Sequence, residues 1–550
     1  MVPLMPYAII VGAILVLFSD VLGRQLDEFS APIILPVMMI GILFYEKLSR
    51  HLLHLFTLFL VPMVVMSHQY FLTEEIPALK DWTEEQGHKL PLIRDVDVSY
   101  YLRQEGKGFI LGPYEKGGIP WAVDGVPAAF GQELLQPDLD RIEEIMCTAM
   151  EQVELITKAG IKTVVNGPIT YTPDGHPLIG PVHGYTNYFV CTGFNFGIVQ
   201  GGGAGHFMSQ WIVNGHPALD LFELDPRRFG DYSDHQYCVD KATEVYANEY
   251  QLGFPNEYAM RPAQRGLKKA PAYDRQSEKN AVFGAYYGWE RASWFAPEGV
   301  EPQEHHSFRR GNWFEPVAAE CTHVQEHVGL LDLSPFTKFE IAGDGAHAWL
   351  ESLSPNRIPT DVGATALAHP LTAEGGVAWE FSITKLQNGS YYMMAPAAGE
   401  LLIEDWLTQR LPTDNSVELT NITRQYGTLV LAGPDARKVL AKLTDSDLSN
   451  EGFPWFTGQE IEVAGAPVHA LRMNFVGELG WELHHPIEHQ AALYDALIDA
   501  GKEWDIKDFG LRAMDSMRLE KGYPMWGHDL ITEFTALEAN LGWFVKLDKG

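Results

Sequence analysis

Two long apolar runs occupy the first 50 positions, and shorter periodic segments follow them. Met1–Ser19 and Phe29–Tyr45 contain no charged residue. A membrane-spanning helix needs roughly 20 consecutive apolar residues, so residues 7–23 and 30–46 are predicted to form a hydrophobic helical hairpin. We assign residues 1–58 to this hairpin and expect membrane association through it.

The pattern changes after this region to that of an α+β protein. His68–Thr73, Tyr100–Arg103 and Gly108–Leu111 alternate between apolar and polar residues, which is typical of strands. The polar tetrapeptide Gln104–Lys107 separates the last two as a hairpin turn would. Apolar residues recur at spacings of three and four along Asp138–Ala159, which predicts an amphipathic helix.

A glycine-rich stretch, Gly193–Ile212, is the most distinctive local feature. A strand-like run, Tyr188–Thr192, precedes it, and a helix is predicted over His206–Ile212. A dinucleotide fingerprint needs GxGxxG directly after a first strand. Gly201–His206 reads GGGAGH, which lacks the third glycine, and it follows a long stretch of folded sequence. A dinucleotide fingerprint is therefore not indicated, although a backbone without Cβ atoms can still approach a ligand closely.

Composition and charge narrow the possible partners. The 550 residues carry a formal net charge of -32, so the phosphates of a nucleic acid would be repelled. The length predicts several domains. The four cysteines are scattered without a CxxC spacing, so the sequence predicts neither a metal site nor a disulfide framework.

Several sequence motifs then occur in a characteristic order. They are HQY with a following Thr at residues 68–73, LPLIRDVDVSYYLRQEGKGFILGPYE at residues 90–115, PDLDRIE at residues 137–143 and NGPITYTPDGHPLIGPV at residues 166–182. With the glycine stretch, they resemble the substrate half of the dimethylglycine and sarcosine dehydrogenase family, flavoenzymes of the DAO superfamily. The resemblance implies a partial DAO-type domain with an antiparallel sheet at residues 59–212 and a connecting central subdomain at residues 213–270.

The same resemblance implies roles for individual residues. His68 and Tyr101 (or its neighbour Tyr100) would face the flavin and orient the N-methyl group of a small amine. The segment that would contact FAD comprises Phe196, Gly197, Ile198, Val199, Gln200 and Gly201.

This sequence departs from the family in its first part. The βαβ unit with GxGxxG that holds the ADP half of FAD is expected in the family and is not found in the sequence. Residues 1–50 instead resemble the end of an iron–siderophore ABC permease. We therefore expect half a flavin site, produced either by a gene fusion or mispredicted start, or by a membrane-tethered variant.

The second half resembles another protein family. The segments are WFEPVAAECTHVQEHVGLLDLSP at residues 313–335, MNFVGELGWELHHP at residues 473–486 and MDSMRLEKGYPMWGHDL at residues 514–530. They resemble the folate-binding aminomethyltransferase domain of the glycine cleavage T-protein, placed at residues 271–550. The chain stops inside that domain, so its closing C-terminal barrel is expected to be missing.

The resemblance also implies a folate site. A carboxylate such as Glu482 can pair with two adjacent N–H groups of a pterin. Glu380 stands where the family has an acidic residue, commonly Asp, near the folate N10, and Phe475 stands where it has Tyr. The remaining expected walls of the pocket are Trp379, Phe381, Leu483, His484 and Trp543.

The sequence thus predicts FAD-dependent oxidative N-demethylation of a dimethylglycine- or sarcosine-like amine, with transfer of the C1 unit to tetrahydrofolate. The electron acceptor stays open between oxygen and an electron-transfer flavoprotein. The family is cytoplasmic by resemblance, apart from the predicted hairpin. Three alternatives remain: an aminomethyltransferase-like protein with a vestigial flavin half, an inactive fusion product, and a membrane-anchored transport component.

Overall fold

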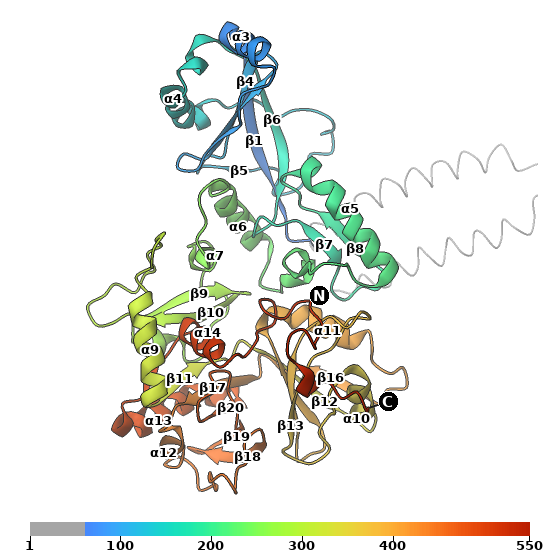
Figure 1. Cartoon of the computed structure of the whole chain (residues 1–550), viewed down its shortest axis with the longest axis vertical. Helices are drawn as coiled ribbons and strands as arrows, with labels where there is room; N and C mark the ends of the chain where they lie inside the picture. Colours follow the sequence, from blue (N-terminus) through green and yellow to red (C-terminus); the bar gives the residue numbers. More distant parts are fainter. Residues whose placement is uncertain (1–60, 550) are drawn as a thin grey trace, which may run out of the picture. The chain divides into compact units, whose positions relative to one another are not determined.

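The computed structural model describes residues 61–549 as one compact α+β unit, in which several sheets follow one another along the chain (Figure 1). The predicted hydrophobic hairpin and its permease-like sequence lie outside the described residues. Across residues 61–549, no helix is both long enough and apolar enough to cross a membrane.

The first sheet has six antiparallel strands. Its order is β2-β3-β4-β1-β5, and β6 pairs with β1 over ten residues. The strands are β1 (Val64–Thr73), β2 (Ile93–Asp95), β3 (Tyr100–Glu105), β4 (Gly108–Pro113), β5 (Ile119–Pro120) and β6 (Ile161–Tyr171). The predicted β3–β4 hairpin is confirmed, and its turn places Gly106 at a φ of 57°.

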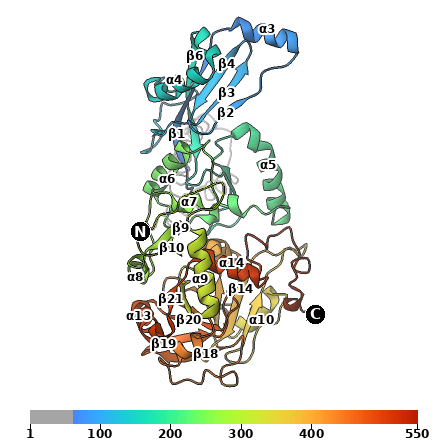
Figure 2. The same ribbon diagram turned by 60° about the vertical axis from the view of Figure 1, so that its left-hand side comes forward.

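Two helices flank this sheet, α3 (Pro77–Gln86) and α4 (Glu143–Gln152), and α4 packs its apolar side against it (Figure 2). The single helix predicted over residues 138–159 is wrong. The structure has a 3₁₀ turn at Asp140–Ile142, then α4, then a second 3₁₀ turn at Glu154–Lys158. The α-helix stops because Val153 adopts φ −128° and ψ 85°. Apolar residues on either side of Val153 still face the core, so the apolar spacing continues although the α-helix does not.

The glycine stretch also differs from its prediction. A two-stranded sheet, β7 (Leu178–Pro181) with β8 (Phe189–Thr192), leads into helix α5 (Gly197–Asn214). The helix therefore begins nine residues before the predicted His206. Glycine lowers helix stability but does not forbid it, and no packed atom lies near the positions where Cβ atoms would stand in the Gly201–Gly203 run.

The connecting region contains short helices and a two-stranded sheet. They are α6 (His235–Ala247), α7 (Glu257–Met260), α8 (Tyr273–Ser277), β9 (Ala281–Tyr286) and β10 (Trp289–Phe295). Asp234 caps α6 by accepting a hydrogen bond from the Tyr237 N–H, as N-cap acids commonly do.

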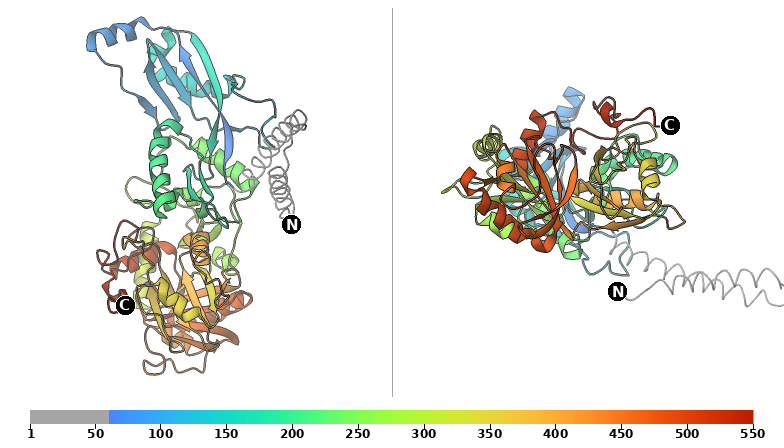
Figure 3. Two further views of the ribbon diagram at one scale, coloured as in Figure 1. Left: turned by 90° about the vertical axis from the view of Figure 1, so that its right-hand side faces the viewer. Right: turned by 90° about the horizontal axis from the view of Figure 1, so that it is seen from below.

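Two further sheets make up the second half of the chain (Figure 3). The six-stranded sheet, in the order β18-β19-β20-β17-β11-β21, contains β11 (Gly329–Asp332), β17 (Tyr426–Ala432), β18 (Gly458–Val463), β19 (Ala466–Leu471), β20 (Gly480–Pro486) and β21 (Lys507–Asp508). The five-stranded sheet, in the order β13-β14-β15-β12-β16, contains β12 (Thr337–Ala342), β13 (Thr365–Ala368), β14 (Phe381–Lys385), β15 (Tyr391–Ala395) and β16 (Glu418–Asn421). Apart from the parallel β11–β21 pair, their pairings are antiparallel.

Helices cover these two sheets and complete their cores. They are α9 (Phe314–Glu326), α10 (Ala346–Leu353), α11 (Glu400–Thr408), α12 (Ala436–Leu440), α13 (Gln490–Gly501) and α14 (Leu511–Glu520). The remaining single-turn 3₁₀ helices are at Phe222–Leu224, Pro226–Arg228, Ala397–Gly399, Ile487–His489, Lys502–Trp504 and Gly542–Phe544. One core lies under the five-stranded sheet with α10 and α11, and a second lies between the six-stranded sheet and α12 and α13.

Candidate functional site

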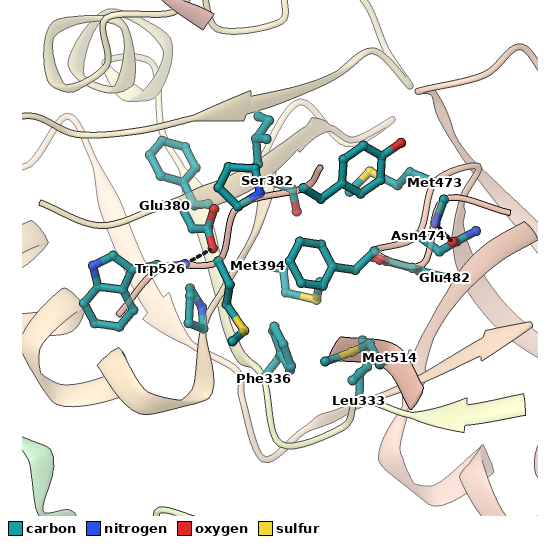
Figure 4. A pocket seen from close by; sticks show the side chains of 18 of the residues that line it. Leu333, Phe336, Glu380, Ser382, Met394, Met473, Asn474, Glu482, Met514 and Trp526 are labelled. Atoms are coloured by element: carbon teal, nitrogen blue, oxygen red, sulfur yellow. Dashed lines mark hydrogen bonds between the residues drawn. The ribbon is translucent and has the colours of Figure 1, made fainter. Parts of the chain in front are cut away.

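A large cavity lies within the second half of the chain. Its volume is about 2140 Å³, and both large sheets, α9, α14 and the segment after α14 contribute residues to its wall. Pockets that hold drug-sized ligands usually measure about 300–1,000 Å³, so this cavity has room for more than a single-ring ligand. Figure 4 shows the labelled side chains that face it.

Glu482 supplies a buried carboxyl group to the cavity. Its strand, β20, is central in its sheet, with Glu482 opposite Val430 of β17 and Leu471 of β19. The residue is 2% exposed, and its Oε2 atom has no hydrogen-bond partner among residues 61–549. Burial raises the pKa of Glu482 to about 8, against the opposing charge of Lys338. The carboxyl is thus mostly protonated at neutral pH, and it must lose this proton before both of its oxygens can accept hydrogen bonds from a ligand.

His484 and Lys338 set the electrostatics around this carboxyl. The Nε2 atom of His484 lies 3.4 Å from Oε2 of Glu482, and its Nδ1 atom lies 3.0 Å from the Tyr392 hydroxyl. Burial lowers the pKa of His484, so the ring is neutral. The Lys338 ammonium donates to the carbonyls of Ser334 and Phe336, both at 2.8 Å, and burial lowers its pKa to about 7.

Glu380 supplies a second carboxylate to the cavity. Its Oε1 atom accepts a hydrogen bond of 3.2 Å from the Trp526 N–H, and its Oε2 atom lies 3.7 Å from Nε2 of the buried His369 (Figure 4). The Trp526 indole in turn donates to the Ala378 carbonyl at 2.9 Å. The loop before β14 is thereby tied to the segment after α14, which holds Glu380 in place.

The structure divides the predicted folate walls into two groups. Phe381 and Phe475 line the cavity, and so does Trp543, which is 83% exposed at its edge. Three other predicted walls do not line it: Trp379, Leu483 and His484.

The position of each of these three residues has a physical reason. Trp379 is buried in the core of the five-stranded sheet, with its ring centroid 5.3 Å from that of Trp406. Leu483 points to the opposite face of β20 from Glu482, because side chains alternate along a strand, and it joins the core with α12 and α13. His484 is fully buried between Tyr392 and Thr428 and reaches the site only through Glu482.

The sequence analysis missed two cations at this site. Lys338 is fully buried and its charge acts on Glu482, and Arg291 of β10 lines the cavity. Each has one polar and one apolar neighbour in its strand, Glu290 and Ala292 for Arg291 and Thr337 and Phe339 for Lys338, so the local sequence does not distinguish either from an exposed strand residue.

The predicted amine-binding residues lie on one face of the first sheet. The His68 ring stacks on that of Tyr114 with centroids 4.5 Å apart, and its Nδ1 atom lies 3.0 Å from the Tyr246 hydroxyl. The Tyr246 hydroxyl donates to Glu115, which forms a buried 2.6 Å ion pair with Arg141. Burial, assisted by Arg141, lowers the pKa of His68 to about 4.

Tyr100 and Tyr101 are separated by strand alternation. Tyr101 packs in the same aromatic cluster as Tyr114 and Tyr250, and burial raises the pKa of its hydroxyl. Tyr100 points to the other face, where its hydroxyl donates to Gln152. Of the two tyrosines, only Tyr101 therefore shares the face of His68.

The predicted flavin segment forms the start of α5. Phe196 packs partly against the aromatic cluster, whereas Ile198 is 100% and Val199 86% exposed. Gly197, Gln200 and Gly201 lie on the same first turns, and this segment lines neither the large cavity nor the smaller one beside Tyr232. The residues present therefore provide an exposed apolar edge against which one face of a flavin could pack, and this segment encloses no flavin pocket within residues 61–549.

Comparison with known proteins links each part of the chain to a family. The family model "GCVT N-terminal domain" matches residues 272–549, "FAD dependent oxidoreductase central domain" matches residues 214–270 and "FAD dependent oxidoreductase" matches residues 48–211. Human mitochondrial dimethylglycine dehydrogenase is 43% identical over 89% of this chain and 56% of its own length.

Two other relatives resemble the chain to a lesser degree. Human mitochondrial sarcosine dehydrogenase is 31% identical over 88% of this chain and 56% of its own length. An aminomethyltransferase of Caldanaerobacter subterraneus is 30% identical over 52% of this chain and 71% of its own length. The chain thus spans just over half the length of the two dehydrogenases that it matches.

Proposed function

Since this chain belongs to the GCVT N-terminal domain family and is a homologue of the dimethylglycine and sarcosine dehydrogenases, we propose that it captures a one-carbon unit on tetrahydrofolate. The unit would come from flavin-dependent oxidation of a small N-methylated amine such as dimethylglycine or sarcosine. The large cavity around Glu482 and Glu380 would hold the folate.

The observation that carries this proposal is the partnerless carboxyl oxygen of Glu482 in the cavity. A pterin has adjacent N–H groups along one edge, and a carboxylate can accept hydrogen bonds from two of them at once. Such a ligand would supply the donor that the protein does not. The 2140 Å³ cavity is also large enough for a folate.

Glu380 would act where charge changes during transfer. It lies on a different side of the cavity from Glu482 in Figure 4, held by the Trp526 N–H. Positive charge would develop beside the folate nitrogen that receives the one-carbon unit. A carboxylate fixed beside it stabilises that charge without reorganising, which is how preorganised groups lower a barrier.

FAD would supply hydride-accepting chemistry when bound. On this chain, His68 would hold the amine through a hydrogen bond, because its pKa of about 4 keeps the ring neutral and makes it a weak proton acceptor. Tyr101 is on the same face and would close the aromatic side of that site. These two residues would position the amine, and neither would remove a proton from it.

A carbon-tracing experiment tests the proposal. The purified chain is supplied with FAD, an artificial electron acceptor, dimethylglycine labelled with ¹³C in its methyl groups, and tetrahydrofolate. We expect labelled 5,10-methylenetetrahydrofolate, and Glu482→Ala should remove it while free labelled formaldehyde rises. Glu488→Ala is the matched control, because Glu488 is exposed six residues further on. Labelled folate formed equally by Glu482→Ala would contradict the assignment of the cavity.

A second function has one observation in its favour. The cavity in the second half is built from packed elements, whereas Ile198 and Val199 of the predicted flavin segment are exposed. This contrast favours a folate-dependent aminomethyltransferase that does not use flavin. Tetrahydrofolate binding by a chain that shows no flavin absorbance after incubation with FAD would support it over the first proposal.

A further inference from the structure

Arg291 projects from β10 toward the large cavity. Its neighbour Glu290 points the other way, where it pairs with Arg265 at 2.5 Å and accepts the Gly266 N–H at 2.6 Å. Because side chains alternate along a strand, Arg291 faces away from that ion pair. It lines the cavity, with its guanidinium carbon 5.4 Å from the centroid of the Phe336 ring.

The guanidinium has no partner for two of its nitrogens. Nε and Nη2 are both buried and make no hydrogen bond within residues 61–549. The Asp332 carboxylate acts on Arg291 through space, but it already accepts hydrogen bonds from Gln490 at 2.7 Å and from the Ser334 N–H at 2.8 Å.

Other arginines that line the same cavity differ in this respect. Arg357 donates to Asp548, Arg472 donates to Asn450, and Arg512 donates through Nη2 to both oxygens of Glu304. Arg472 and Arg512 each leave only Nε without a partner, whereas Arg291 leaves both Nε and Nη2 without an acceptor among the described residues. A buried guanidinium without an acceptor is costly, and a cavity that retains one is suited to a ligand that carries the acceptor.

We propose that Arg291 binds a carboxylate of the ligand in this cavity. A planar guanidinium and a carboxylate match in a bidentate pair, which lysine or an amide cannot reproduce. The inference rests on the proposed function, which involves two ligand carboxylates. One is the glutamyl tail of tetrahydrofolate, and the other is the carboxylate of the N-methylated amino acid.

Binding measurements on the full chain separate these sources. Titration calorimetry uses three probes: tetrahydrofolate, 6-methyltetrahydropterin (which has no tail) and dimethylglycine. If Arg291 binds the tail, Arg291→Gln should weaken tetrahydrofolate binding about tenfold or more and leave the pterin within about twofold, as expected for the loss of a charged hydrogen-bonded pair. If it binds the amino acid, only dimethylglycine should lose affinity.

Two further variants keep the test informative. Arg291→Lys should restore part of the lost affinity, because it keeps the charge but not the planar fork. Arg275→Gln is the matched control, since Arg275 forms a solvent-exposed ion pair with Asp495. Thermal unfolding of each variant checks that it is folded.

Each outcome has a distinct meaning. Unchanged binding of all three probes by Arg291→Gln, with a wild-type chain that binds tetrahydrofolate, would overturn the role of Arg291 and leave the proposed function standing. A wild-type chain that binds none of the probes would contradict the proposed function and the role of Arg291 together.

Discussion

If the cavity binds folate as proposed, the protonation of Glu482 should make the affinity depend on pH in a definite direction. Burial raises the pKa of this carboxyl to about 8 in the free protein. Two N–H donors from a pterin would stabilise the carboxylate, so its pKa should fall on binding and a proton should be released. Affinity should therefore increase as the pH rises from 6 to 8.

The expected magnitude follows from the ionised fraction of the carboxyl. With a pKa of about 8, about 1% of Glu482 is ionised at pH 6 and about half at pH 8, which gives an increase in affinity of about 50-fold. Lys338 faces the same site with a pKa of about 7, and losing its charge removes part of the stabilisation of the carboxylate. His484 and Tyr392 stay neutral across this range. We therefore expect an increase between about 10-fold and about 50-fold.

Titration calorimetry with tetrahydrofolate at pH 6, 7 and 8 measures this dependence, and repeating it in buffers of different ionisation enthalpy counts the released protons. Glu482→Gln is the matched variant, because an amide has the shape of the protonated carboxyl and does not titrate. It should bind nearly as well as the wild type at pH 6 and much more weakly at pH 8. An affinity of the wild type that is flat over this range, or that falls, would contradict the ionisation of Glu482 on folate binding.

Three further predictions concern stability. Glu482 holds its proton more tightly in the folded protein, with a pKa of about 8 against an ordinary 4.5, so it destabilises the fold above pH 4.5 and increasingly so toward pH 8. The melting temperature of Glu482→Gln should therefore exceed that of the wild type by a margin that grows over this pH range. Equal differences in melting temperature at pH 5 and pH 8 would contradict this. Arg141→Met leaves Glu115 buried without its ion-pair partner and should cost about 3–5 kcal/mol in urea unfolding, whereas a loss below about 1 kcal/mol would show that the pair is not needed. Gly201→Ala has open space for its Cβ inside α5 and should stabilise that helix by about 0.5–1 kcal/mol, measured by hydrogen exchange, unless a ligand packs against that glycine.

Local signals in the sequence predicted the regular elements well and their interruptions poorly. The β3–β4 hairpin was predicted because strand alternation and its turn lie within about a dozen residues. The break in the helix at Val153 was not, because the apolar spacing continues on both sides of it. The first turns of α5 were not predicted as helix because glycine has a low helix propensity, although the backbone of glycine residues can still form helical hydrogen bonds.

Family motifs in the sequence identified part of the cavity wall. Glu482 and Glu380 occur in recognisable segments, and both line the cavity. Leu483 and His484 were included because they follow Glu482 in the motif, but their side chains do not line the cavity. Arg291 and Lys338 were missed because their importance comes from packing between strands far apart in the sequence, which no local pattern records.

The most direct test of the account is a crystal structure of the chain with tetrahydrofolate bound. We expect the pterin ring in the cavity, with two of its N–H groups within hydrogen-bond distance of the two carboxylate oxygens of Glu482, about 2.7–2.9 Å. A pterin bound elsewhere, or bound in the cavity with its N–H edge turned away from Glu482, would contradict it.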